Sequence, residues 1–195
     1  QGLTKSLNIA IKHSSGKFLA RQDVDDYSFP ERLEKQIDIF NNNQKLNLVG
    51  TRALLKMENR IVESKIIDNS DILNLLKKNN IFIHSSVMIK KNVFKNINYY
   101  NENFKLSQDY EAWLKLMDLG YGNFFVINEI LIERNIDKNT ISRKNFFQQS
   151  LNGFKLRKKR ISFLLNLYLF IYQYLTNLIP VNIILKIKNI FVWQR

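Results

Sequence analysis

Three carboxylates crowd one short segment of the sequence, at Asp23, Asp25 and Asp26. They follow residues 17–20, whose apolar run predicts a buried strand, and open α/β sheets place ligands at the carboxyl ends of such strands. In extended backbone, Asp23 and Asp25 would project to one side and Val24 to the other. Such a pair favours a divalent-metal and sugar-nucleotide site, because a cation would offset the repulsion. An acidic surface turn is the structural alternative, since aspartate-rich turns are common.

A second acidic position, Asp109, lies in the segment 107–114. Ser107 can cap a helix there, which would put Asp109 in the first helical turn. An apolar stripe that begins at Tyr110 would then face the core. The helix dipole stabilises a first-turn aspartate whatever its function. This segment by itself therefore leaves a structural role and a catalytic role open.

Residue types that are rare or missing exclude several kinds of catalytic and metal site. The chain has no cysteine, which excludes disulfides, thiolate metal sites and cysteine nucleophiles. Its two histidines, His13 and His84, are too few for a multi-histidine zinc site. His84 is interpreted as a hydrogen-bonded packing residue, because its serine neighbours lack an evident triad acid. A metal would therefore bind carboxylates, which suit Mg²⁺ or Mn²⁺.

The elements that must position these carboxylates alternate between helical and strand patterns. Periodicity predicts helices over 3–11, from Phe29 to about 40 and over 72–76, with strands at 17–20, 46–49 and 81–83. Ser28 and Glu31 match a capping box for the second helix, whose buried stripe would be Leu33, Ile37 and Phe40. Ser70 is predicted to cap the third helix.

Length and composition indicate a folded chain with one sizeable domain and an appendage. Of the 195 residues, 45% are hydrophobic and 24% are charged, which is typical of a protein that packs a core. The net charge of +13 favours an anionic partner: nucleic acid, an acidic membrane surface or a phosphorylated substrate. Scattered lysine-asparagine runs are interpreted as solvated surface.

The carboxyl-terminal part combines a basic cluster with an apolar segment. Basic residues crowd 155–160, and no charged residue then follows until Lys186. The aromatic run 161–172 favours helices lying at a membrane surface over a true span, because polar residues interrupt the segment. A helical hairpin packed on the catalytic domain is the structural alternative.

Several motifs share an order and spacing with a known family. The run from Gly2 to Ile11, then Gly16, 23–26, 30–33 and Gln36, resembles the middle of a bacterial-type family 2 glycosyltransferase. Residues 84–88, 99–104 and 108–113, and Arg134 before 140–142, resemble later landmarks of that family. The resemblance covers roughly residues 1–145, which we take as a partial catalytic domain, with 146–195 as a basic and aromatic helical membrane-associating segment.

The resemblance implies an α/β fold of the GT-A type, with a Rossmann-like sheet flanked by helices and followed by apolar helices. A nucleotide diphosphate sugar would be the donor, with Mg²⁺ or Mn²⁺ as cofactor. By analogy, Asp23 lies towards the ribose, and Asp25 with Asp26 binds the metal that bridges the diphosphate. Asp109 matches the family's catalytic base and would deprotonate the acceptor hydroxyl in an inverting displacement.

The resemblance also implies a role in cell-surface polysaccharide synthesis, with a saccharide or lipid-linked saccharide as acceptor. We expect the enzyme to sit peripherally on the cytoplasmic face of the membrane, held by an anionic surface, and expect no nucleic-acid partner. A non-catalytic basic module that binds membrane or nucleic acid is the competing class. Gln108 replaces the family's usual glutamate beside the base. The family's first strands should precede Gln1, so these residues alone are expected to bind donor poorly.

Overall fold

The chain divides into two compact units, residues 1–137 and 138–195. The computed structural model describes residues 2–57, 60–136 and 145–178, and each unit is described by itself. The resemblance to later family landmarks at 140–142 falls outside the described residues. The functional boundary after residue 145 stays a prediction.

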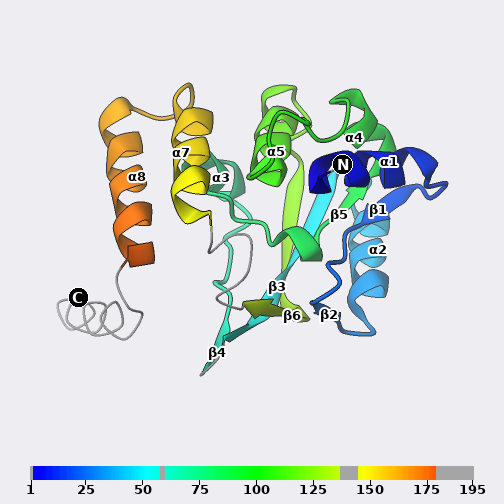
Figure 1. Cartoon of the computed structure of the whole chain (residues 1–195). Coiled ribbons are helices and arrows are strands. Elements are labelled where there is room, and N and C mark those ends of the chain that lie inside the picture. The colour runs from blue at the N-terminus through cyan, green and yellow to red at the C-terminus, as the bar shows by residue number, and fades with distance from the viewer. Residues whose placement is uncertain (1, 58–59, 137–144, 179–195) are drawn as a thin grey trace. The chain divides into compact units, whose positions relative to one another are not determined.

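A mixed sheet forms the centre of the first unit (Figure 1). Its strands are β1 (Phe18–Ala20), β2 (Tyr27–Ser28), β3 (Leu48–Met57), β4 (Arg60–Glu63), β5 (Met88–Lys90) and β6 (Phe124–Ile136). Within the described residues their order is β1-β5-β3-β6-β2, with β4 paired to β3. β3 and β6 run parallel, whereas β1–β5, β5–β3, β6–β2 and β3–β4 are antiparallel.

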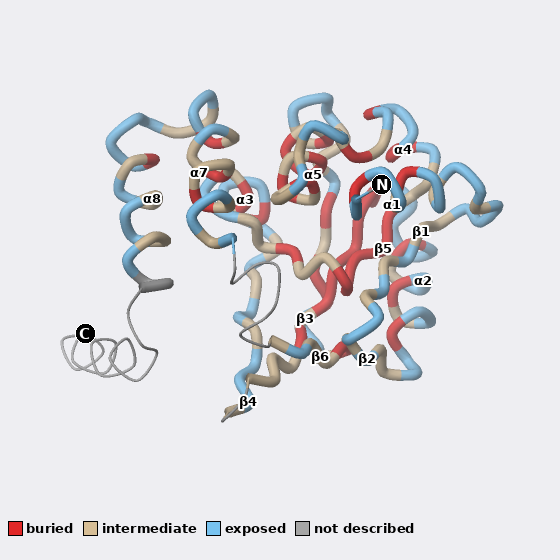
Figure 2. Tube along the Cα trace, in the orientation of Figure 1, coloured by how far each residue is buried: buried red, intermediate tan, exposed pale blue. Residues whose placement is uncertain are grey.

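Both faces of the sheet are covered at the start of β3 and at β5, as Figure 2 shows by the buried colour there. Leu48 and Val49 are successive residues of β3, and both are fully buried. Because side chains alternate along a strand, they serve opposite faces. Val49 joins a cluster that includes Phe40 of the preceding helix, α2 (Arg32–Asn42). The strand predicted at 46–49 overlaps β3 only at Leu48 and Val49, because β3 begins two residues later and continues to Met57.

Five α-helices and one 3₁₀ helix accompany this sheet in the described residues. They are α1 (Leu3–His13), α2 (Arg32–Asn42), α3 (Ile72–Lys78), α4 (Lys91–Asn96), α5 (Gln108–Asp118) and the 3₁₀ helix His84–Ser86. The predicted helices at 3–11, 72–76 and after Ser107 are confirmed, as is the strand at 17–20. α3, however, has Asp71 at its N-cap in place of Ser70.

The predicted start of the second helix is wrong. Ser28 belongs to β2 and pairs with Ile132, so it cannot form a capping box with Glu31. α2 begins at Arg32 and buries Arg32, Gln36 and Phe40. The predicted stripe is correct only at Phe40, because the helix turns a partly polar face towards backbone carbonyls that need donors.

The predicted strand at 81–83 is also wrong. These residues lead into the 3₁₀ helix, and the strand that joins the sheet is β5, beginning at Met88. Phe82 nevertheless enters the core, with its ring 6.2 Å from Trp113 and 5.7 Å from Phe124 in edge-on contacts. The apolar run therefore predicted the burial of Phe82 correctly, but it did not predict the backbone conformation.

The described part of the second unit is a helical pair, α7 (Phe146–Arg157) and α8 (Phe163–Leu178). Arg157 and Asn166 are each 1% exposed, and the Arg157 Nε donates to the Asn166 Oδ1 at 3.0 Å. A Cβ at Gly153 would stand 3.0 Å from the Arg157 Nη1, so the glycine makes room for the guanidinium. In the described residues, no helix combines the length and apolar character needed to cross a membrane.

Candidate active site

The acidic segment forms a turn between β1 and β2. The Asp26 N–H donates to the Asp23 carbonyl at 3.3 Å, and the chain reverses direction there. The predicted extended arrangement of Asp23 and Asp25 is therefore wrong, and Val24 at the turn is fully exposed. The charge of Asp23 acts on Asp26. Turn geometry, rather than strand alternation, decides which carboxylates meet.

Asp26 is a half-buried member of this turn. Burial raises the pKa of its carboxyl above the ordinary 3.8, while the Ser85 hydroxyl, the Arg134 charge and the Asn135 N–H oppose the rise. That N–H donates to the Asp26 Oδ1 at 3.2 Å. The Asn135 Nδ2 also donates to the Asp25 carbonyl at 2.5 Å. The end of β6 thus holds the acidic turn from outside the local sequence.

Two arginines connect the acidic turn to the fold. The Arg21 Nη2 lies 2.5 Å from the Asp23 Oδ1 in a partly exposed ion pair. Arg32, which is 2% exposed, donates through Nη1 to the carbonyls of Arg21 and Ser85 at 3.1 and 2.5 Å. One buried guanidinium therefore ties together the end of β1, the 3₁₀ helix and α2.

Asp109 lies in the first turn of α5, as predicted, and is half-buried. Ser107 occupies the N-cap position in a left-handed conformation with φ of 62°. The Asn80 Nδ2 donates to the Asp109 Oδ2 at 2.7 Å. Among the described residues, no hydrogen bond engages the other carboxylate oxygen, Oδ1. One oxygen is thus oriented while the other is able to accept a proton.

His84 lies within the influence of both acidic positions. Its Nε2 is 2.7 Å from the Tyr100 hydroxyl, and its ring meets Trp113 edge-on at 6.3 Å. These contacts agree with the interpretation of His84 as a hydrogen-bonded packing residue. Desolvation lowers the pKa of His84, and the charges of Asp109 and Asp23 both oppose that lowering. Two carboxylates that are distant in sequence therefore act on one imidazole.

Local sequence patterns predict none of the polar contacts made to these carboxylates. Arg21 precedes the acidic run and could have been noticed by its position alone. Asn80 lies 29 residues before Asp109 in the sequence, yet its side chain donates to that carboxylate. Ser85 falls within the landmark at 84–88, but its spacing does not predict its effect on Asp26. Such partners carry no spacing signal, because the fold alone brings them together.

The residues of the acidic turn offer hard oxygen ligands but not a complete cage. Within the described ranges, no group of three histidine, aspartate or glutamate side chains could hold a metal ion. Asp25 is exposed and Asp26 half-buried, and their carboxylates are of the type that Mg²⁺ and Mn²⁺ prefer. Mg²⁺ sites commonly use one or two carboxylates and complete the shell with water and substrate phosphates. The residues present fit that kind of site.

The fold is shared with solved glycosyltransferase structures. A mannosyltransferase from Pyrobaculum calidifontis, in complex with GDP-Man and Mn²⁺, aligns with a TM-score of 0.60 at 16% identity over 91% of this chain and 50% of its own. S. aureus TarS in complex with UDP aligns with a TM-score of 0.54 at 15% identity, over 80% of this chain and 45% of its own. The first unit therefore has the GT-A type of α/β fold, as the resemblance implied.

The sequence itself defines the family. Residues 1–98 match the family described as glycosyl transferase family 2. The O-antigen biosynthesis glycosyltransferase WbnJ of Escherichia coli is 31% identical, over 86% of this chain and 68% of its own length. The putative glycosyltransferase EpsE of Bacillus subtilis is 27% identical, over 74% of this chain and 52% of its own. The chain belongs to glycosyltransferase family 2, and it spans about half the length of EpsE.

Proposed function

We propose that this chain carries the metal and acceptor side of an inverting glycosyltransferase. It would move a sugar from a nucleotide diphosphate donor to a hydroxyl of a saccharide or lipid-linked saccharide in cell-surface polysaccharide synthesis. The observation that carries the proposal is the common electrostatic environment of the acidic turn and α5. Asp23 and Asp109 both act on His84 and on Tyr100, although 86 residues separate them in sequence.

In the proposed reaction, Asp109 accepts the acceptor's hydroxyl proton as that oxygen attacks the anomeric carbon. Asn80 holds the Oδ2, which leaves the Oδ1 for the proton. The bond to the donor diphosphate breaks on the opposite face, so the anomeric configuration inverts. Asp25 and Asp26 would hold Mg²⁺ or Mn²⁺, which would supply positive charge beside the leaving diphosphate. Asp23 would lie towards the ribose, fixed by its ion pair with Arg21.

The test is a panel of nucleotide sugars with the full-length protein, measuring release of nucleoside diphosphate with Mn²⁺ and with chelator. We expect Asp109→Asn to lower transfer by about a hundredfold or more while donor binding is retained, because a general base contributes that much. Asp38→Asn is the matched control, since it removes an exposed carboxylate of α2. Transfer that persists in Asp109→Asn would disprove the role of Asp109 as base.

We propose, in addition, that the second unit attaches the enzyme to a membrane surface. α8 exposes large apolar or aromatic side chains, including Leu164 at 77% and Tyr168 at 61%. Its polar Asn166 is buried against Arg157 instead. A helical pair with a polar interior and an apolar exterior suits the headgroup region better than water. Attachment would bring a lipid-linked acceptor to the catalytic domain.

Sedimentation with phosphatidylcholine vesicles tests this attachment. We expect Leu164→Ser with Ile171→Ser to release the protein, because both side chains are exposed on α8. Asn145→Ser, which lies outside α8, is the control variant and should sediment as the wild type does. Equal sedimentation of the α8 variant and the wild type would rule the attachment surface out.

A further inference from the structure

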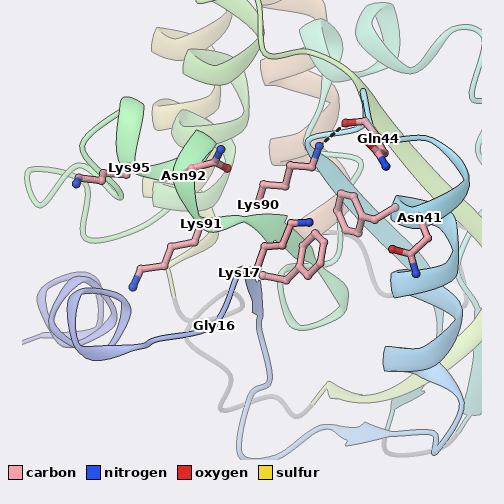
Figure 3. Close-up of a pocket in the computed structure, with 10 residues that line it drawn as sticks. Gly16, Lys17, Asn41, Gln44, Lys90, Lys91, Asn92 and Lys95 are labelled. Carbon is pink, nitrogen blue, oxygen red and sulfur yellow. Dashed lines mark hydrogen bonds between the residues drawn. The ribbon is translucent and has the colours of Figure 1, made fainter.

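A basic pocket lies at the end of β1 that is remote from the acidic turn. It has a volume of about 570 Å³, and its walls come from the start of β1, the end of α2 and the junction of β5 with α4 (Figure 3). Four of its lining residues are lysines: Lys17, Lys90, Lys91 and Lys95. The pocket plays no part in the proposed glycosyl transfer.

Two of the lysines lie beside a pair of stacked rings. Phe18 of β1 is the cross-strand partner of Lys90 on β5, and its ring stacks on Phe40 of α2 with centroids 4.6 Å apart. The Lys17 Nζ is 5.4 Å from the Phe18 centroid, and the Lys90 Nζ is 6.0 Å from the Phe40 centroid. Figure 3 shows both ammonium groups near the rings, whereas Lys91 points away from them.

The positive charge of the pocket lacks a compensating carboxylate. Among the described residues, no ion pair joins any of the four lysines to an aspartate or glutamate. The Lys90 Nζ donates to the Gln44 carbonyl, which occupies one of its three donors. Desolvation lowers the pKa of Lys90, and the charge of Lys17 lowers it further. The crowded ammonium groups repel one another, and an anion between them would offset that repulsion.

We propose that this pocket binds a phosphate group, with Lys17 and Lys90 as its charged ligands and the side-chain amides of Asn41 and Gln44 as further donors. A tetrahedral anion with several acceptor oxygens matches ammonium and amide donors supplied from two sides. Phe18 and Phe40 form an apolar floor that limits competition from water. A phospholipid headgroup and a soluble phosphate ester offer the same group.

The variant Lys17→Gln/Lys90→Gln tests the site, and Lys65→Gln/Lys78→Gln is the matched control, because it removes two exposed lysines outside the pocket. Soluble phosphate is supplied as pyrophosphate, with affinity measured by calorimetry against sodium chloride of equal ionic strength. The headgroup is supplied as phosphatidylglycerol vesicles. Binding to phosphatidylcholine vesicles is subtracted, because it measures the apolar attachment alone. Lys17→Gln alone, at an exposed position, covers the case in which the double variant fails to fold.

We expect the pocket variants to weaken binding to one or both probes by about tenfold or more, and the control to change it little, since a charge-assisted hydrogen bond is worth about that much. Loss with pyrophosphate alone indicates a soluble phosphate ester, and loss with phosphatidylglycerol alone indicates a lipid headgroup. Equal weakening in pocket and control variants would overturn the proposal in favour of diffuse attraction by net charge. Pyrophosphate binding that is lost in Asp25→Asn and kept in the pocket variants would overturn it too, by assigning the anion to the acidic turn.

Discussion

The Nε2 of His84 lies 2.7 Å from the hydroxyl of Tyr100, and their rings meet edge-on with centroids 5.5 Å apart. The pair joins the 3₁₀ helix to Tyr100, a buried residue in the segment after α4. Desolvation raises the pKa of the Tyr100 hydroxyl and lowers the pKa of the His84 imidazole, so the neutral form of each is favoured. A neutral imidazole can accept or donate one hydrogen bond here without placing a buried charge beside Trp113.

This pair predicts a loss of stability at acidic pH. The folded pKa of His84 is lowered from 6.5, so below about pH 6.5 the unfolded chain binds a proton that folded His84 does not. The free energy of unfolding should therefore fall as pH falls through that value, by at most about 1.4 kcal/mol per unit from this group. Urea melts of His84→Gln should show a shallower fall between about pH 7 and pH 5.

The control for that experiment is His13→Gln, which removes the chain's other histidine from the exposed end of α1. A pH dependence that is the same in His84→Gln as in the wild type would contradict the assignment to His84.

A second prediction concerns a conflict between stability and function at Asp26. Burial raises its pKa above 3.8, so at neutral pH the ionised carboxylate favours the unfolded chain. Asp26→Asn should stabilise the fold by no more than about 1 kcal/mol at pH 7, because solvent screens this half-exposed position. The gain should vanish as pH falls towards the ordinary value.

The same substitution should abolish metal-dependent donor turnover. Thermal melts at neutral and acidic pH, read beside nucleotide release, measure both effects. A variant that is destabilised at neutral pH would show that hydrogen bonds to the carboxylate outweigh its burial.

A third prediction concerns Asn80 as a positioning residue. Its Nδ2 holds the Asp109 Oδ2 at 2.7 Å, so Asn80→Ala should leave the base free to rotate. We expect kcat to fall by about tenfold with the donor KM unchanged, because a misplaced base weakens proton transfer. Asn74→Ala, at an exposed position on α3, is the matched control. A fall in donor affinity in place of kcat would assign Asn80 to donor binding.

A fourth prediction concerns the polar interior of the helical pair. Arg157 donates to Asn166 at 3.0 Å, and Asn166 donates to the Phe154 carbonyl at 2.8 Å. Arg157→Ala should destabilise this unit by about 2–4 kcal/mol, since it leaves buried polar groups without partners. Limited proteolysis should then cleave α7 and α8 faster. Lys159→Ala, an exposed charge between the two helices, should leave the cleavage rate unchanged.

Helices and strands could be predicted from the local sequence wherever the spacing of apolar residues followed one clear period. α1, β1 and α5 lie where their apolar spacing indicated, because one buried face organises each of them. The prediction failed at Ser28, where pairing with Ile132 of β6 draws the residue into a strand. It failed again at 81–83, where an apolar run is buried without strand pairing. At Ser28 a distant strand decides the backbone conformation, whereas at Phe82 ring contacts with Trp113 and Phe124 explain the burial.

The sequence by itself determined the family, the acidic segment and the position of Asp109 in a helix's first turn. These features depend on residue types at short spacing, which local patterns record. Only the tertiary structure decided that Asp26 meets Asn135, that Asn80 orients Asp109, and that four lysines surround one pocket. Such contacts join residues that are far apart in the chain, so nothing in local spacing encodes them.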